Sequence, residues 1–301
     1  MNSCPDATFE VLGISCHTTL NATNAKKILD AKSKIVGKQT AINIKRIVEQ
    51  EQTNKINEAK NLATSYPNGF SKYFPNTSLY NINYQKAIEI LSYRTQIINI
   101  HNFINRINNA VSGWGDIKGI PYYYFYHYYP TRFTDVTSAS REVRGLIYNF
   151  KDGSSHSKVL SIVKQKLNST FYYEDLESLC FVCIPASTVN DNNCRYRNFS
   201  RDLCEELDMY NGFEYIKITK EKSKSHLGGT DSAEYYLDGS FFNGKYVILF
   251  DDVVTRGRSM KEFKQLLENK GATVICALSI GRTYSDYYGD NREPHPWSGE
   301  Y

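Results

Sequence analysis

The sequence predicts an α/β protein in which a parallel sheet is flanked by helices, with an α-helical extension on its N-terminal side. Beyond residue 120, apolar strand-like runs alternate with segments of helical spacing, as is typical of a parallel sheet covered on both faces. Before residue 111, the long segments have helical spacing. The segment "SGWGDIKGIP", residues 112–121, separates the two regions. We therefore predict a helical extension over residues 1–111 and an α/β domain over residues 112–301, an organisation that 301 residues allow.

The extension is predicted mainly from the spacing of its isoleucines. Residues 24–62 predict one or two amphipathic helices, and residues 84–111 predict another helix. The intervening "SYPNGFSKYFPNTS", residues 65–78, has the Pro, Asn, Gly and Ser content of a loop. Near the start of the chain, "FEVLGIS" resembles a short strand or an edge segment that packs on other elements.

Net charge is only +4, which does not by itself indicate a nucleic-acid-binding protein. Residues 24–62 nevertheless hold nine Lys and Arg against four Asp and Glu, a local charge of 9 − 4 = +5. This segment fits either a solvated helix face or a surface for nucleic acid or a protein partner.

The α/β region is predicted element by element. A strand over the aromatic run "YYYFYHYY", residues 122–129, is followed by a helix over "SREVRGLIYNFKDG" with Gly153 just past its end. The later elements are, in order, a helix at 157–167, a strand "LCFVCIP", a helix at 200–209, a strand "FEYIKIT", a strand "KYVILF", a helix at 259–270 and a strand "TVICALSIG".

Cysteine usage and hydropathy bear on the compartment. The seven cysteines are an odd number, and Cys180 and Cys183 lie in an apolar run. They fit reduced core thiols better than a disulfide framework, although their C-x-x-C spacing leaves zinc or redox chemistry as the alternative. No basic leader with an apolar core and no run of about 18 apolar residues occurs, so we expect a cytoplasmic protein without a membrane partner.

The segment "KYVILFDDVVTRGRSM", residues 245–260, carries the chemistry. In a parallel sheet, ligands bind beyond the carboxyl ends of the strands, where the next helix offers free N–H groups. Gly257 allows a tight turn and close approach of an anion, while Thr255 and Ser259 supply hydroxyls. The Walker pattern is absent. Asp251 and Asp252 would repel a phosphate and suit vicinal hydroxyls or a hard cation such as Mg²⁺. A sugar phosphate with a metal-bound leaving group meets these demands.

The motif "VILFDDVVTRGRS" closely resembles the 5-phosphoribosyl-1-pyrophosphate (PRPP) signature of type I phosphoribosyltransferases. The resemblance covers about residues 120–285 and is best to the ComF-like, competence-associated subgroup. "REVRGLIYNFKDG", "CFVCIPAS" and "RYRNFSRDLCEEL" are similar to further segments of that subgroup, whereas the first 110 residues show no such resemblance.

The resemblance implies a role for each matching residue. It assigns Asp251 and Asp252 to the ribose 2′- and 3′-hydroxyls, with Mg²⁺ meeting them indirectly through Mg-PRPP. It assigns the 5-phosphate to Thr255, Arg256, Gly257, Arg258 and Ser259, and pyrophosphate to the loop of Pro185, Ala186 and Ser187. The segment "KEKSKSHLGG", residues 220–229, falls where these enzymes carry a flexible lid. Arg256 and Arg258 fit either a clamp for a highly charged ligand or ion pairs with the neighbouring helix.

The function implied is Mg²⁺-dependent transfer of the phosphoribosyl group from PRPP to a nitrogenous base or amine, with release of pyrophosphate. Asp251 or Asp252 would stabilise the positive charge that develops at C1. The acceptor is open, because Tyr284, Tyr287 and Trp297 fit either base stacking or surface packing. The alternative is a non-catalytic PRPP or nucleotide sensor, or a competence- or nucleic-acid-associated adapter, that uses the same pocket and contacts its partner through residues 24–62.

Overall fold

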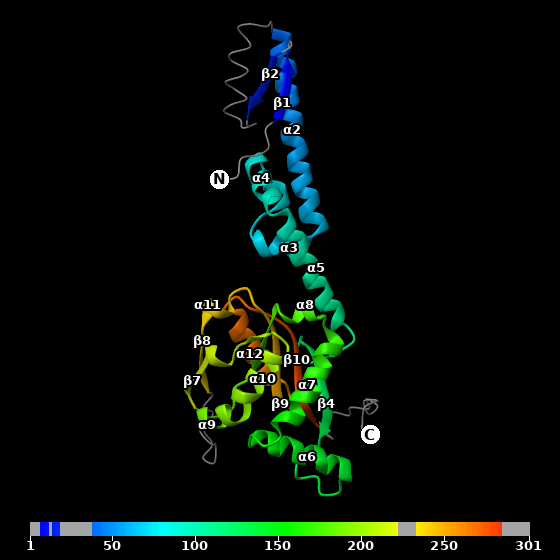
Figure 1. Ribbon diagram of the computed structural model, residues 1–301, viewed down its shortest axis with the longest axis vertical. Coiled ribbons are helices and arrows are strands. Elements are labelled where there is room, and N and C mark those ends of the chain that lie inside the picture. The colour runs from blue at the N-terminus through cyan, green and yellow to red at the C-terminus, as the bar shows by residue number, and fades with distance from the viewer. Residues whose placement is uncertain (1–6, 12–13, 19–37, 222–232, 285–301) are drawn as a thin grey trace. The chain divides into compact units, whose positions relative to one another are not determined.

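The computed structural model describes residues 7–11, 14–18, 38–221 and 233–284 (Figure 1). The chain divides into two compact units, Met1–Asn105 and Arg106–Tyr301. The division falls inside helix α5 (Arg94–Ala110), and the sequence-based boundary lies just past the end of that helix. No helix in the described part of the chain is long and apolar enough to cross a membrane.

The first unit combines a small hairpin with helices. Strands β1 (Ala7–Val11) and β2 (Ile14–Thr18) pair antiparallel. The segment "FEVLGIS", residues 9–15, for which a short strand or an edge segment is predicted, includes the end of β1 and the start of β2. The remaining elements are α2 (Lys38–Ser65), α3 (Pro67–Tyr73), η1 (Leu79–Asn81), α4 (Tyr84–Ser92) and the start of α5. Their core contains Leu62, Phe70, Phe74, Ile90 and Ile97.

Two predictions for this unit were wrong in part. The segment 65–78 contains helix α3, because Pro67 occupies the first helical turn, where its missing N–H costs nothing. The helix at 84–111 is interrupted at Tyr93, whose ring packs against Phe74 with centroids 5.7 Å apart. Of the helical segment 24–62, residues 24–37 lie outside the described residues, and α2 covers the rest.

The second unit is built on a six-stranded sheet, which confirms the predicted α/β class. Its order is β3 (Gly115–Asp116), β4 (Pro121–Tyr128), β10 (Thr273–Thr283), β9 (Tyr246–Val254), β5 (Leu179–Cys183) and β6 (Tyr210–Asn211). All neighbouring pairs are parallel except β3 with β4. The four long parallel strands therefore end at one common edge, where ligands of such sheets bind.

Helices cover both faces of the sheet (Figure 1). They are α6 (Ser138–Lys151), α7 (His156–Thr170), α8 (Tyr173–Leu176), α9 (Val189–Asn192), a π-helical turn η2 (Asn193–Arg197), α10 (Asn198–Glu206), η3 (Phe213–Tyr215), α11 (Gly239–Phe242) and α12 (Arg258–Glu268).

The two faces can be told apart by the alternation of side chains along β5 and β9. Phe250 packs against Phe150 of α6 and Phe199 of α10. The neighbouring Leu249 belongs instead to the core cluster that contains Phe263 of α12. Successive side chains of a strand point to opposite faces, so α6 and α10 lie on one side of the sheet and α12 on the other.

The predicted strand "FEYIKIT" exists only in part and does not join the main sheet. Its C-terminal part is β7 (Ile216–Lys220), which pairs antiparallel with β8 (Glu234–Leu237) in a separate two-stranded sheet. The 3₁₀ turn η3 turns the chain away after β6, so the short β6 forms the edge of the main sheet.

Candidate functional site

The common edge of the sheet brings together the two segments that the sequence singles out. Asp251 and Asp252 lie near the end of β9, and Pro185 follows the end of the neighbouring β5. The Ile184 N–H, just before Pro185, donates to the Phe250 carbonyl at 2.8 Å. Segments far apart in the sequence therefore lie side by side at this edge.

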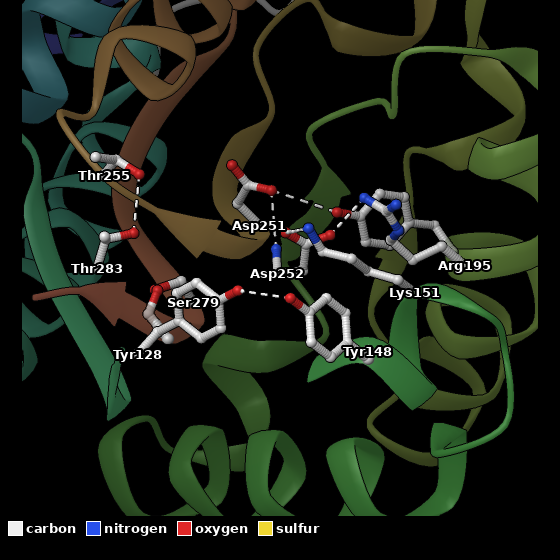
Figure 2. Close-up of polar contacts among 11 residues, drawn as sticks. Tyr128, Tyr148, Lys151, Arg195, Asp251, Asp252, Thr255, Ser279 and Thr283 are labelled. Carbon is white, nitrogen blue, oxygen red and sulfur yellow. Dashed lines mark hydrogen bonds and ion pairs between the residues drawn. The ribbon is translucent and has the colours of Figure 1, made fainter. Parts of the chain in front are cut away.

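Asp252 is a buried carboxylate held by two cations. Its residue is only 4% exposed. One carboxylate oxygen accepts from Arg195 Nη1 of the π-helical turn, and the other lies 3.6 Å from Lys151 Nζ of α6 (Figure 2). Because a buried charge is costly unless it is paired, these two cations make burial of Asp252 tolerable. Neither cation was assigned to the site from the sequence, although both belong to the segments "REVRGLIYNFKDG" and "RYRNFSRDLCEEL".

Asp251 has a different environment and is only partly buried. Its Oδ1 accepts from the Asp252 backbone N–H at 2.8 Å (Figure 2). The same oxygen accepts from the Tyr196 hydroxyl at 3.4 Å. Desolvation, followed by the charge of Asp252, raises the pKa of Asp251 above that of an ordinary aspartate. The two adjacent carboxylates are therefore not equivalent, because Asp252 has the cations and Asp251 has neutral donors.

The residues after β9 form the predicted glycine turn. Gly257 adopts φ +68° and caps α12, whose N-terminus has no side-chain cap. A Cβ at this position would lie 2.4 Å from Ile117 Cγ1, so both conformation and packing require glycine. The first N–H groups of a helix have no partner within the helix, so the start of α12 can receive an anion.

Of the other phosphate-site residues, Thr255 is exposed and its hydroxyl lies 2.8 Å from that of Thr283 on β10. Ser259 is exposed. Arg256 and Arg258 are also exposed, and no ion pair joins either of them to another residue within the ranges that the structure covers.

The loop after β5 is fixed by hydrogen bonds to residues of the same segment and of the helix that follows it. The buried Ala186 N–H donates to Asn192 Oδ1 at 3.1 Å, and the Thr188 hydroxyl caps α9 by accepting from the Asp191 N–H at 3.1 Å. Pro185 is partly buried and Ser187 is exposed. Loop 185–187 therefore has a defined path beside the acidic pair and presents Ser187 to solvent.

A further loop at this edge, after β4, is tied to α6. The Arg144 guanidinium donates to the carbonyls of Tyr129, Pro130 and Phe133 at 3.0–3.2 Å. Tyr284 stacks on Tyr129 with ring centroids 4.8 Å apart. Tyr284 thus has a packing role on this loop, while Tyr287 and Trp297 lie outside the described residues.

The lid predicted at 220–229 falls outside the described residues except at its first two positions. Lys220 is the last residue of β7, and Glu221 accepts from the Val189 N–H at 2.8 Å, next to loop 185–187.

Cys180 and Cys183 are buried free thiols on β5. Three residues apart on a strand, they point to opposite faces, and burial raises the pKa of both. This geometry fits core packing. Over the described ranges, no three His, Cys, Asp or Glu side chains gather as a metal site. Asp251 and Asp252 supply carboxylate oxygens at this edge of the sheet, and Mg²⁺ is commonly held by one or two carboxylates together with phosphate oxygens.

Comparison with known proteins places this part of the chain in a recognised class. Residues 197–293 match the family model described as the phosphoribosyl transferase domain, so this part of the chain carries a phosphoribosyltransferase domain. The matched range includes the acidic pair and the glycine turn, whereas loop 185–187 and Arg195 precede it.

A more particular likeness is to the competence protein ComFC of Streptococcus pneumoniae (strain ATCC BAA-255 / R6). The two are 28% identical over 129 residues, a match that covers 39% of this chain and 56% of ComFC. The chain thus spans just over half of that relative's length. The resemblance to phosphoribosyltransferases, and to the ComF-like subgroup in particular, is confirmed, with ComFC as a distant homologue.

Proposed function

We propose that the second unit binds Mg-PRPP at the carboxyl edge of its sheet and transfers the phosphoribosyl group to a nitrogenous base or amine. One observation carries this proposal. The buried strand β9 ends with the carboxylate pair, which is followed by a glycine of left-handed conformation at the N-terminus of α12, where no side chain caps the helix. Loop 185–187 lies directly beside this strand end. The arrangement supports a ligand with hydroxyls in the middle and anionic groups at both ends.

In this proposal the acidic pair takes the ribose hydroxyls. The 5-phosphate is held by the N–H groups at the start of α12, the hydroxyls of Thr255 and Ser259, and Arg256 and Arg258. Because these arginines have no ion-pair partner in the described ranges, their charges are available to an anion. Pyrophosphate lies on Pro185, Ala186 and Ser187.

The proposed reaction exchanges one bond at C1 of the ribose. The bond from C1 to the pyrophosphate oxygen breaks with its electron pair leaving on pyrophosphate, and the acceptor nitrogen forms the new bond and loses a proton to solvent. Asp251 and Asp252 lie where Mg²⁺ carried by PRPP could be held, and the ion would supply charge neutralisation for the leaving pyrophosphate. Asp251 or Asp252 stabilises the positive charge that develops at C1 and orients the ribose.

Ligand-dependent unfolding tests the proposal. PRPP with Mg²⁺ at about 100 times Kd should stabilise the folded protein by about 2.7 kcal/mol, seen as a rise in melting temperature. Gly257→Trp should abolish this rise, and Asp252→Asn should reduce it. An unchanged rise in both variants would refute the site assignment. Incubation with a panel of bases and amines, with pyrophosphate release as the readout, then identifies the acceptor.

A sensor or adapter is the second candidate, and the surface of α2 favours it. Ile42 and Ile47 are 57% and 51% exposed on this helix, beside the basic residues Lys45 and Arg46. Stabilisation by PRPP without consumption of it by any acceptor would support a sensor. Retention of the full chain on nucleic acid that weakens with salt and with Lys45→Glu and Arg46→Glu would support an adapter. Absence of retention at low salt would remove the adapter.

We also propose that residues 1–111 and 112–301 act as separate domains, so that any partner-binding surface and the PRPP site are carried on different parts of the chain. Limited proteolysis that released a stable fragment beginning near residue 112 would support this boundary.

A further inference from the structure

Both carboxylates of the acidic pair are contacted by one short segment. Arg195 and Tyr196 are consecutive residues of the π-helical turn η2. Arg195 contacts Asp252 (Figure 2), and Tyr196 contacts Asp251. A π-helical turn inserts an extra residue into a helix and is frequent at functional sites. Here the turn follows loop 185–187 through α9, so one continuous segment links the proposed pyrophosphate loop to the proposed ribose carboxylates.

The contacts of Asp252 leave it little freedom to bind a ligand. Its side chain is 5% exposed and that of Arg195 is 16% exposed, so their ion pair is shielded from water. Lys151 Nζ stands at the second oxygen of Asp252. A ligand hydroxyl would have to displace a cation from a buried carboxylate, which is unfavourable because the cation would be left without its partner.

Within the described ranges, no ion pair joins Asp251 to a cation. It is more exposed than Asp252, and the groups that donate to it are a backbone N–H and, at the long distance of 3.4 Å, a tyrosine hydroxyl. One carboxylate has two oxygens with several lone-pair directions, enough to accept from two adjacent hydroxyls. The buried Arg195 Nε has no hydrogen-bond partner among the described residues, so this guanidinium is held at the site although one of its donors stays unsatisfied.

We propose that Arg195 is a positioning residue that engages Asp252 and thereby leaves Asp251 as the carboxylate that receives the ribose hydroxyls. This inference rests on the proposed function and divides the acidic pair into two roles. Asp252 holds the π-helical turn against β9, and Asp251 accepts hydrogen bonds from the ribose hydroxyls. Asp252 still matters for binding, because without it Arg195 turns to the neighbouring Asp251, whose charge it already senses.

The binding of two sugar phosphates, ribose 5-phosphate and 2-deoxyribose 5-phosphate, tests these separate roles of Asp251 and Asp252. The two sugar phosphates differ by one hydroxyl, so the ratio of their dissociation constants measures recognition of that hydroxyl. Above about pH 8, where Asp251 with its raised pKa is ionised, a hydrogen bond to a charged group predicts that wild-type protein favours ribose 5-phosphate roughly tenfold. Asp251→Asn should reduce the preference to about threefold or less.

The decisive comparison is between Asp252→Asn and the double variant Asp252→Asn with Arg195→Met. In the single variant, the unpaired guanidinium should occupy Asp251, and the preference for the 2-hydroxyl should fall to about threefold or less. In the double variant the Arg195 guanidinium is gone, while Lys151, which lies 3.6 Å from the opposite oxygen of Asp252 in the wild type, remains. Asp251 is then released from the guanidinium, and the preference should return to roughly tenfold. Arg195→Lys, which keeps the cation, should retain the wild-type preference.

A double variant no better than Asp252→Asn would overturn the inference, because Asp252 itself would then be needed for the hydroxyl. Circular dichroism of each variant checks that it is folded, and Arg195→Lys against wild type gives a second measurement if the methionine variant does not fold. Loss of the preference in Arg195→Lys would then overturn the inference. Arg201→Met, an exposed arginine one helix turn beyond η2 that pairs with Asp202, is the matched control and should keep the preference. Wild-type protein that binds neither probe nor PRPP would overturn the proposed function and this inference with it.

Discussion

Replacing Gly257 by alanine should destabilise the second unit by an amount that the structure allows us to work out. The backbone at this position has φ +68°, and an L-residue there costs about 1–2 kcal/mol. The new methyl group would lie 2.4 Å and 2.6 Å from two carbons of Ile117, and overpacking of this kind costs about 1–3 kcal/mol. The free energy of unfolding should therefore fall by about 2–5 kcal/mol.

The assay is urea or thermal unfolding followed by tryptophan fluorescence, because both tryptophans, Trp114 and Trp297, belong to the second unit. A domain of this size loses about 2–4 °C in melting temperature per kcal/mol, so the expected fall is roughly 5 °C or more. Gly145→Ala is the matched control. Gly145 lies inside α6, and apart from its chain neighbours and the nearby backbone of its own helix no atom lies within 4 Å of the added methyl, so alanine should stabilise by about 0.5–1 kcal/mol. Equal stabilities of Gly257→Ala and wild type would refute the conformational argument.

Three further outcomes are expected. Arg106→Met should cost about 2–3 kcal/mol in the second unit, since Asp175, 2% exposed, would lose its bidentate partner; a change below about 0.5 kcal/mol in urea unfolding would contradict this. Because the folded protein raises the pKa of Asp251, it favours the protonated form of this side chain. The contribution of Asp251 to stability is therefore fully present below its unfolded pKa of about 4 and is lost as the pH rises through the folded pKa. Wild type should therefore lose stability relative to Asp251→Asn as the pH is raised above about 4, and parallel pH profiles would count against the raised pKa. Gly69→Ala should loosen the first unit, because the methyl would lie 1.8 Å from the Ile97 carbonyl oxygen, and amide hydrogen exchange of α3 should accelerate; unchanged protection would show that the close approach is absent.

Much of the fold was predictable because its signals are local. The apolar run of β9 and the glycine at the start of α12 are consecutive in the chain, and so are the carboxylates between them. The alternation of strands and helices likewise indicated a parallel sheet. The errors arose where tertiary packing overrides local composition. A Pro- and Gly-containing segment became α3, and its Gly69 lies against the backbone of α5 at Ile97. The strand β7 left the main sheet.

The phosphoribosyltransferase motif could be recognised from residues 247–259 because strand, turn and helix start follow one another, and local backbone preferences act over such short distances. The partners of its carboxylates could not be inferred in that way. Arg195 stands 57 positions before Asp252, and Lys151 comes from a different helix. Their positions depend on how α6 and the π-helical turn pack on β9. Folding therefore makes two adjacent, chemically identical aspartates unequal, since burial and the placement of cations are properties of the packed structure.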